Sequence, residues 1–195
     1  MSGIAFFDFD GTICRGDSFL AFIRFAKGRG AYRRGILWLS PWIVLYFLRL
    51  YPNWRLKERF FSHFFKGAEE AALMAIGEAF SATVLPQMCR PDMLERIRWH
   101  QSQGHEVVVL TASSAIWLGG WCRRQKAQLT GTAFQVKDGC YTGKLEGFNC
   151  HGLRKKDLVA AKLAGGAYAN NTYGYGNSRS DAAFLKLVAH PQRMR

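Results

Sequence analysis

The chain opens with a short apolar segment, continues as a long block with helical periodicity, and then alternates between apolar and amphipathic segments. Residues 3–9 form an apolar, β-prone run, which predicts a buried strand that ends at a pair of aspartates. Apolar residues then recur at helical spacing, with glycines or prolines at the breaks, and this pattern predicts four consecutive helices over residues 18–30, 33–52, 53–67 and 68–86.

Beyond Pro86 and Pro91, predicted strands and helices alternate. The pattern predicts strands over residues 105–113 and 171–177, a hairpin over 133–145 that turns at Asp138-Gly139, and helices over 91–104, 115–129, 153–166 and 178–190.

This alternation is typical of the α/β class, with a doubly wound, Rossmann-like parallel sheet. The helical block that follows the first strand is then an α-helical cap inserted into that fold. We therefore predict a core domain made of residues 1–16 and 89–195, and a cap domain of residues 17–88.

Composition agrees with a folded protein: 195 residues, of which 49% are hydrophobic, are enough to bury a core without cross-links. The five cysteines include no CxxC pair, which argues against a disulfide framework and a zinc site and fits a reducing cytosol. The N-terminus has no basic segment typical of a signal peptide, so we expect a cytoplasmic protein.

The formal net charge is +13, and much of it is concentrated in one segment. Between Arg24 and Lys66 there are ten basic residues and a single acid, Glu58, which gives this segment a charge of +9. Such a cluster attracts nucleic acid, anionic lipid or phosphorylated substrates, although a solvated basic surface has the same composition. Nothing in the chain resembles a nucleic-acid-binding motif, so no specific nucleic-acid partner is expected.

Residues Gly35 to Leu48 contain no charge. A membrane span needs about twenty apolar residues, and Pro41 interrupts this shorter run. The run therefore favours a cap helix of a soluble domain. An interfacial helix with basic flanks, in peripheral contact with the inner membrane surface, is the alternative.

Asp8 and Asp10 leave the first strand on the same side, because side chains two residues apart in a strand share a face. Two crowded carboxylates repel each other unless one holds a proton or a cation lies between them. A hard cation such as Mg²⁺, a phosphate group, or both would account for the pair.

Four segments occur in the order and context of a known family: DFDGT after the first strand, VVVLT at the end of a second, CHGLRKK at a helix start, and GNSRSD after a third strand. Together they resemble the four motifs of the haloacid dehalogenase superfamily, over nearly the whole chain. Gly152 lies three residues before Lys155, and this spacing and the cap position resemble subfamily IB, which contains the phosphoserine-phosphatase-like enzymes. The apolar cap helix resembles in placement that of phosphatidylglycerophosphate phosphatases.

The resemblance implies catalytic roles for four residues. Asp8 would be the nucleophile that forms an aspartyl-phosphate, and Asp10 the general acid and then the general base. Thr111 would hydrogen-bond a phosphoryl oxygen, and Lys155 would neutralise charge on the phosphoryl group. The adjacent Lys156 is an alternative to Lys155.

The remaining residues that the resemblance implies bind substrate, phosphate or metal. Mg²⁺ would be held by Asp8, the backbone carbonyl of Asp10 and Asn177, while Asp181 would orient a metal-bound water or Lys155. Asn177 replaces the aspartate that is commonest at its position, but an amide oxygen would still be able to coordinate Mg²⁺. Phosphate or substrate contacts are expected from Gly11, Thr12, Ala112, Ser113 and Asp17.

The resulting prediction is a Mg²⁺-dependent phosphatase acting on a small organic phosphate or a lipid phosphate headgroup. Few acids occur in the cap, so a small amino-acid phosphate is not favoured. The alternative is a non-catalytic, basic membrane- or nucleic-acid-binding protein on a relict fold. Relatives usually continue into another strand after the last helix, whereas the final segment AHPQRMR ends there, so we expect a sheet one strand shorter or an edge covered in another way.

Overall fold

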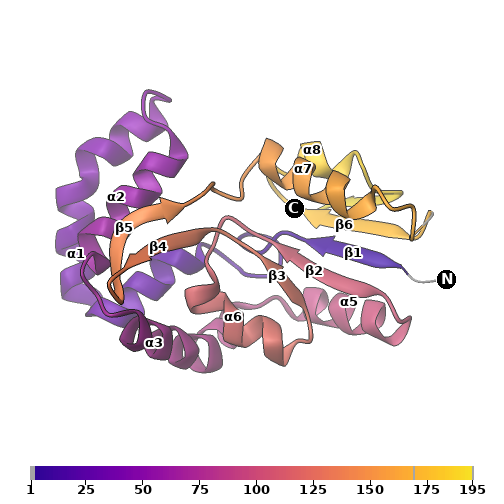
Figure 1. Cartoon of the computed structure of the whole chain (residues 1–195), viewed down its shortest axis with the longest axis horizontal. Helices are drawn as coiled ribbons and strands as arrows, with labels where there is room; N and C mark the ends of the chain where they lie inside the picture. The colour runs from indigo at the N-terminus through magenta and orange to yellow at the C-terminus, as the bar shows by residue number, and fades with distance from the viewer. Residues whose placement is uncertain (1–2, 169, 195) are drawn as a thin grey trace.

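A five-stranded, all-parallel sheet forms the centre of the molecule in the computed structural model, which describes residues 3–168 and 170–194 (Figure 1). Its spatial order is β3-β2-β1-β6-β7, so β1 lies in the middle and the chain adds strands on both sides of it. The strands are β1 (Ile4–Phe7), β2 (Glu106–Leu110), β3 (Gln128–Thr130), β6 (Thr172–Gly176) and β7 (His190–Arg193). The predicted α/β class and doubly wound parallel sheet are confirmed.

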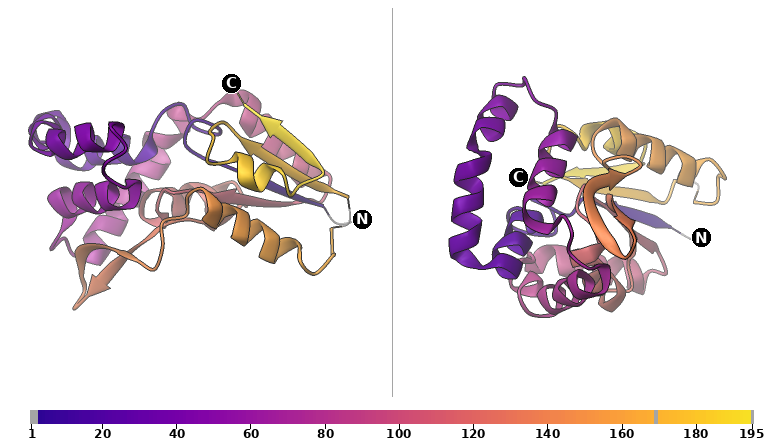
Figure 2. Two further views of the ribbon diagram at one scale, coloured as in Figure 1. Left: turned by 90° about the horizontal axis from the view of Figure 1, so that it is seen from above. Right: turned by 60° about the vertical axis from the view of Figure 1, so that its left-hand side comes forward.

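Helices and a hairpin connect these strands (Figures 1 and 2). The helices that follow the insertion are α5 (Pro91–Ser102), α6 (Ala115–Arg124), α7 (Leu153–Leu163) and α8 (Ala182–Leu185). Separate clusters of buried apolar side chains cover the two faces of the sheet, since alternate residues of β1 point to opposite faces. Phe7 belongs to one cluster and Phe6 to the other.

The strand register aligns the three ends that carry polar motifs. Phe7, the last residue of β1, pairs with Val109 of β2 and Tyr175 of β6. Asp8 therefore emerges at the same edge as the residues that follow the neighbouring strands. In parallel sheets of this kind, ligands bind outside the carboxyl ends of the strands.

Between β1 and β2 lies a helical insertion made of α1 (Ser18–Phe47), α2 (Asn53–Phe65), α3 (Glu70–Thr83) and α4 (Leu85–Met88). Asp17 caps α1, because its Oδ1 accepts a hydrogen bond from the Leu20 amide at 2.9 Å. The predicted break at the glycines occurs at Gly28, whose φ of 78° interrupts the helical geometry of α1. In the described part of the chain, no helix combines the length and apolarity that crossing a bilayer requires.

The antiparallel hairpin of β4 (Ala133–Lys137) and β5 (Cys140–Glu146) leaves the main sheet and packs on the helical insertion (Figure 1). Its turn lies at Asp138-Gly139 as predicted, with φ values of 50° and 73°. The Phe134 ring stacks on Phe61 of α2 with centroids 3.5 Å apart. The hairpin therefore packs against one side of the insertion, although it lies far from it in sequence, directly after β3.

The predictions for the segments at both edges of the sheet were wrong. The helix predicted over residues 115–129 ends at Arg124, and β3 follows it, where Leu129 aligns with Val109 of β2. The helix predicted over residues 178–190 is only the short α8. The last segment forms β7 in parallel to β6, so the sheet is not one strand shorter, and β7 is itself the strand at that edge. A proline is tolerated in an edge strand, so Pro191 does not prevent pairing, and it leaves that edge a poor template for further strands.

The close approach of α3 and α6 generates a stability prediction. A Cβ atom at Gly77 of α3 would lie 1.7 Å from the Ile116 carbonyl oxygen, a backbone atom that cannot move aside cheaply. We expect Gly77→Ala to lower the free energy of unfolding by about 1–3 kcal/mol through overpacking.

Gly30→Ala in α1 is the matched control, because no atom lies within 4 Å of the added methyl group. Alanine has the higher helix propensity, so this variant should be neutral or slightly stabilised. Thermal and urea unfolding measure both variants. A Gly77→Ala protein as stable as Gly30→Ala would contradict the described packing of α3 on α6.

Candidate active site

A small cavity of about 230 Å³ lies at the carboxyl edge of the sheet, where the helical insertion covers it. Residues of α1, α2 and α7 meet here with residues of the loops that follow β1, β2, β5 and β6, so the cavity brings together segments that are far apart in sequence. The cavity is lined by Asp8, Asp10, Asp17, Phe19, Asn53, Lys57, Thr111, Ala112, Ser113, His151, Lys155, Asn177, Ser178 and Ser180.

Lys155 holds two carboxylates at the floor of this cavity. Its Nζ lies 2.5 Å from Asp8 Oδ1 and 2.8 Å from Asp181 Oδ1, and all three side chains are buried. The Thr12 hydroxyl donates to the other Asp8 oxygen at 2.9 Å. Lys156, the alternative from the sequence, is exposed.

The pKa values of the three groups in this cluster shift in different directions. Burial raises the pKa of Asp8 to about 6, against the opposing attraction of Lys155, because the carboxylate loses its hydration. Burial also acts on Asp181, but Lys155 and the Ser178 donors outweigh it and keep the pKa of that carboxyl below its usual range. For Lys155, burial disfavours the charge, yet the two carboxylates hold its pKa above the usual range. Asp8 is thus the member whose negative charge is least compensated.

Asp10 is fixed by hydrogen bonds that come from two different elements. Its Oδ1 accepts from the Ser18 amide of α1 at 2.7 Å, and its Oδ2 accepts from the Ser113 hydroxyl at 2.6 Å. Burial and the nearby Asp17 raise the pKa of Asp10, and these hydrogen bonds partly oppose the rise. This environment favours a carboxyl group that can hold a proton.

The hydrogen bonds extend from Asp10 to the first turn of α1 and to α6. The Trp117 indole donates to the Ser18 hydroxyl at 3.1 Å, and the two serine hydroxyls lie 3.0 Å apart. An indole N–H only donates and a carboxylate only accepts, so the chain runs from Trp117 through Ser18 and Ser113 to Asp10. Asp10 is therefore oriented by the start of the helical insertion.

Gly11 and Asn177 pack directly against each other. Gly11 has a φ of 84°, and a Cβ atom there would lie 2.1 Å from Asn177 Nδ2, so both the backbone conformation and the space require glycine. The loop after β6 is thereby held beside the turn that follows β1. Asp181 supports that loop, since its Oδ2 accepts from the Ser178 amide at 3.0 Å and the Ser178 hydroxyl at 2.6 Å.

The residues expected after β2 face the cavity in different ways. The Ser113 amide donates to Thr111 Oγ1 at 3.0 Å, which orients the Thr111 hydroxyl, and the Ala112 carbonyl accepts from Lys57. The Ser113 amide thus already has a partner within the protein, and its hydroxyl binds Asp10. Asp17 lies in the cavity wall while it caps α1.

A hard cation fits the donors in this cavity. Asp8, Asp10 and Asn177 all line the cavity, and the carboxylate, carbonyl and amide oxygens that they could offer are the ligand types that Mg²⁺ prefers. The raised pKa of Asp8 shows a carboxylate whose charge a cation would compensate. Among residues 3–168 and 170–194, no three side chains of His, Cys, Asp or Glu gather as a metal site. The ion would thus depend on the carbonyl and amide oxygens.

Lys57 of α2 is the principal cavity residue that the sequence analysis missed. Its Nζ donates to the Ala112 carbonyl and, at 2.9 Å, to Asn149 Oδ1. Asn149 in turn donates to Asn53 Oδ1 at 2.9 Å, so the chain segment after β5 is hydrogen-bonded to the first turn of α2. Burial lowers the pKa of Lys57 to about 8, against the attraction of Asp10 and Asp17. Within a basic segment, nothing in the sequence distinguishes this lysine from its solvated neighbours.

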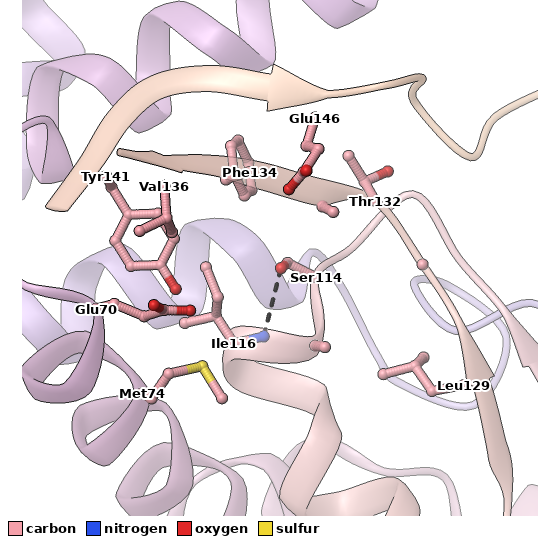
Figure 3. Close-up of a pocket in the computed structure, with 13 residues that line it drawn as sticks. Glu70, Met74, Ser114, Ile116, Leu129, Thr132, Phe134, Val136, Tyr141 and Glu146 are labelled. Atoms are coloured by element: carbon pink, nitrogen blue, oxygen red, sulfur yellow. Dashed lines mark hydrogen bonds between the residues drawn. The ribbon is translucent and has the colours of Figure 1, made fainter. Parts of the chain in front are cut away.

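A larger cavity of about 660 Å³ lies elsewhere, between α3, the start of α6 and the β4–β5 hairpin (Figure 3). Figure 3 shows apolar side chains such as Ile116 and Phe134 in its wall, together with the carboxylates Glu70 and Glu146. None of its described lining residues is Lys or Arg. It does not suit an anion, so the smaller cavity is the candidate active site.

A family profile and two named relatives match most of this chain. Residues 5–186 match the profile of the family described as haloacid dehalogenase-like hydrolase. Protein CicA of Caulobacter vibrioides is 30% identical over 184 residues, which cover 93% of this chain and 81% of CicA. Phosphoserine phosphatase SerB1 of Mycobacterium tuberculosis is 26% identical over 201 residues, which cover 96% of this chain and 63% of SerB1.

Solved structures share the fold. A protein of unknown function from Bordetella pertussis Tohama I superposes with a TM-score of 0.78 at 25% identity, covering 95% of this chain and 86% of that one. A phospho-aspartyl intermediate analogue of a phosphoserine phosphatase superposes with a TM-score of 0.69 at 16% identity, covering 96% and 84% of the two chains.

The Lys155 cluster makes a prediction about stability and pH. Lys155→Met leaves two buried carboxylates without their cation, which costs about 3–5 kcal/mol of unfolding free energy at pH values where both are ionised. Without Lys155 both carboxyl pKa values rise, so protonation removes part of the cost as the pH falls. The loss relative to wild type should therefore be largest in mildly alkaline buffer and smaller near pH 5.

Lys156→Met is the matched control, because this neighbouring side chain is exposed and should change stability little at either pH. Urea unfolding at both pH values measures the two variants. Equal stability of Lys155→Met and Lys156→Met would contradict the buried cluster.

Proposed function

This chain belongs to the haloacid dehalogenase-like hydrolase family, and from that premise we propose that it is a Mg²⁺-dependent phosphatase that hydrolyses a phosphate monoester through an aspartyl-phosphate. One observation carries the proposal. The Asp8 carboxylate is held by Lys155 and Thr12, and Asp10, a carboxyl with a raised pKa, lines the same cavity.

The first step forms a bond between an Asp8 oxygen and phosphorus while the bond from phosphorus to the leaving oxygen breaks. Asp10 gives its proton to that oxygen, so an alcohol leaves instead of an alkoxide. The raised pKa of Asp10 favours the protonated form that this step needs.

The second step returns the enzyme to its starting state. A water molecule attacks phosphorus and gives a proton to Asp10, the bond to Asp8 breaks, and inorganic phosphate leaves. Lys155 holds Asp8 in place and opposes the negative charge on the phosphoryl group, while the Thr111 hydroxyl lies at the end of β2 to bind a phosphoryl oxygen. Bound Mg²⁺, held by Asp8, the Asp10 carbonyl and Asn177, would supply further positive charge to that group.

The helical insertion would act as a cap domain over residues 17–88, with residues 1–16 and 89–195 as the core domain. It contributes Asn53 and Lys57 to the cavity, and Asp17 lies at its start. A volume of about 230 Å³ is below the range of drug-sized ligand sites, so we propose a small organic phosphate as the substrate. The opposite charges of Lys57 and Asp17 suit a leaving group that carries a further polar or charged substituent.

Hydrolysis of p-nitrophenyl phosphate tests the reaction. The purified protein should release p-nitrophenol with Mg²⁺, and EDTA should stop it. Asp8→Asn should lower kcat more than about a thousandfold, because removal of a nucleophile is among the largest single losses in catalysis. Asp157→Asn, an exposed aspartate of α7, is the matched control and should retain activity. Undiminished turnover by Asp8→Asn, or turnover unaffected by EDTA, would contradict the proposed mechanism.

Lys57 predicts how substrate preference depends on pH. A substrate with an extra carboxylate should be favoured over p-nitrophenyl phosphate while Lys57 is charged, and this preference should fade as the pH rises through about 8. Lys57→Met should reduce kcat/KM for the carboxylate-bearing substrate about 10–100-fold, the value of a hydrogen bond to a charged group.

The ratio of kcat/KM for the two substrates, measured from neutral to alkaline pH, isolates this effect from other titrations. Lys66→Met, an exposed lysine just after α2, serves as the control. A ratio that varies with pH in the same way in Lys57→Met and wild type would show that Lys57 does not bind the leaving group.

A further inference from the structure

The second half of α1, from Gly35 to Phe47, carries no charged side chain on any face, but it is packed on one side only. Gly35 and Leu39 are buried, and Trp42, one helical turn further on, is partly buried against the core. The opposite stripe contains Leu37 and Val44, which are exposed. A helix with mainly apolar residues on all faces is normally buried on all sides, so this one lacks a partner on its outer side.

The exposed side chains are large, and they continue past the end of the helix. Leu37 and Phe47 are each 76% exposed, and Leu50, in the connection to α2, is 71% exposed. We call this set the outer apolar surface and define it as Leu37, Val44, Phe47, Leu48, Leu50 and Trp54. Contiguous exposed apolar patches on a protein surface mark interaction sites.

Arginines surround the outer apolar surface. Arg33 and Arg34 precede it, and Arg49, Arg55 and Arg59 lie at its far end, all exposed. The Arg55 guanidinium lies 5.1 Å from the ring centre of Trp54, so cationic and aromatic groups are presented together.

The surrounding charge is almost entirely positive. Glu58 is the single acid between residues 24 and 66. Its carboxylate accepts from the Leu145 amide of β5 at 2.9 Å, so it is directed to the hairpin and does not neutralise the arginines.

The position of α1 leaves this surface accessible. Figures 1 and 2 show α1 at the end of the molecule remote from β6 and β7, with α2 on its inner side. The first two turns of α2 present residues on two sides. Asn53 and Lys57 line the cavity, whereas Trp54 and Arg55 are exposed.

We propose that the outer apolar surface and its arginines dock this protein on an anionic lipid membrane, with α1 lying in the interface. Apolar side chains enter the boundary between headgroups and acyl chains, while arginines bind lipid phosphates. No described helix is able to span the bilayer, so the contact is peripheral. Because α2 joins this surface to the cavity, docking holds the candidate active site beside the headgroups.

Charge decides between this occupant and two others. A second copy of the chain would bring together two surfaces that each carry the +9 segment, which repel each other. A nucleic acid would satisfy the arginines but would leave the exposed Leu, Val and Phe side chains in water. An anionic membrane complements both the charge and the apolarity.

Vesicle flotation tests the proposal without reference to catalysis, so its result is independent of the proposed phosphatase activity. The full chain is mixed with vesicles of phosphatidylcholine, or of equal parts phosphatidylcholine and phosphatidylglycerol, at low and high salt. We expect binding to the anionic vesicles at low salt, at least tenfold weaker binding to the neutral ones, and loss of the electrostatic part at high salt.

Two double variants separate the contributions. Arg49→Gln with Arg55→Gln should weaken partitioning roughly 25-fold, at about fivefold for each arginine. Leu37→Ser with Leu50→Ser should weaken it at least as much, because both side chains leave water on docking. Leu153→Ser is the matched control: Leu153 is also 71% exposed but lies on α7, away from the outer apolar surface.

Circular dichroism establishes that each variant is folded. Light scattering after size exclusion reports the oligomeric state. The proposal is overturned if wild type does not float with anionic vesicles at low salt, or if the leucine variants bind like Leu153→Ser. A wild-type dimer that becomes monomeric in the leucine variants would overturn it in favour of a self-association surface.

Discussion

The burial of Lys155 between two carboxylates is the interaction on which the rest of the site depends. Three charges out of water are expensive unless each has its partners, and here Lys155 compensates Asp8 and Asp181 at once. The ion pairs join the end of β1, the first turn of α7 and the segment after β6. Any displacement of one of these elements would leave a buried charge unpaired, so the same contacts that position the chemistry also fix the relative placement of three chain segments.

The sequence was sufficient to predict what depends on local pattern and on motif order. The apolar run before Asp8, the strand before Thr111 and the glycine turn of the hairpin each carry a pattern that strongly constrains the backbone, and the structure has them where expected. Lys155, the lysine with the expected spacing from Gly152, is the one that contacts Asp8. The predictions failed where a short apolar segment is compatible with both a helix and a strand. Leu129 follows a helix without a clear break, and β7 contains a proline, so only pairing with β2 and β6 makes these segments strands.

Contacts between distant segments that no family motif marks could not be predicted. Lys57 resembles every other basic residue of its segment until α2 places it against the Ala112 carbonyl. The chain of donors from Trp117 to Asp10 likewise joins residues separated by about a hundred positions. It runs through Ser18, which belongs to no motif, and through Ser113, for which the sequence predicts a phosphate contact instead. These contacts tie Asp10 to the start of the helical insertion, so a movement of the insertion would be transmitted to Asp10. The motifs thus predict the residues at the carboxyl edge of the sheet. The contact of Lys57 with the cavity and the orientation of Asp10 become apparent only in the structure.

The stacking of Phe134 on Phe61 also has a consequence for how the protein is made. The ribosome synthesises α2 well before the hairpin that covers it. The separation between β1 and its neighbour β6 is longer still. A nascent chain that has just completed α2 therefore exposes the aromatic surface that the finished protein hides. Its early helices remain prone to aggregation until the hairpin emerges from the exit tunnel. Folding of the insertion is for this reason expected to finish late in translation, or under the protection of a chaperone.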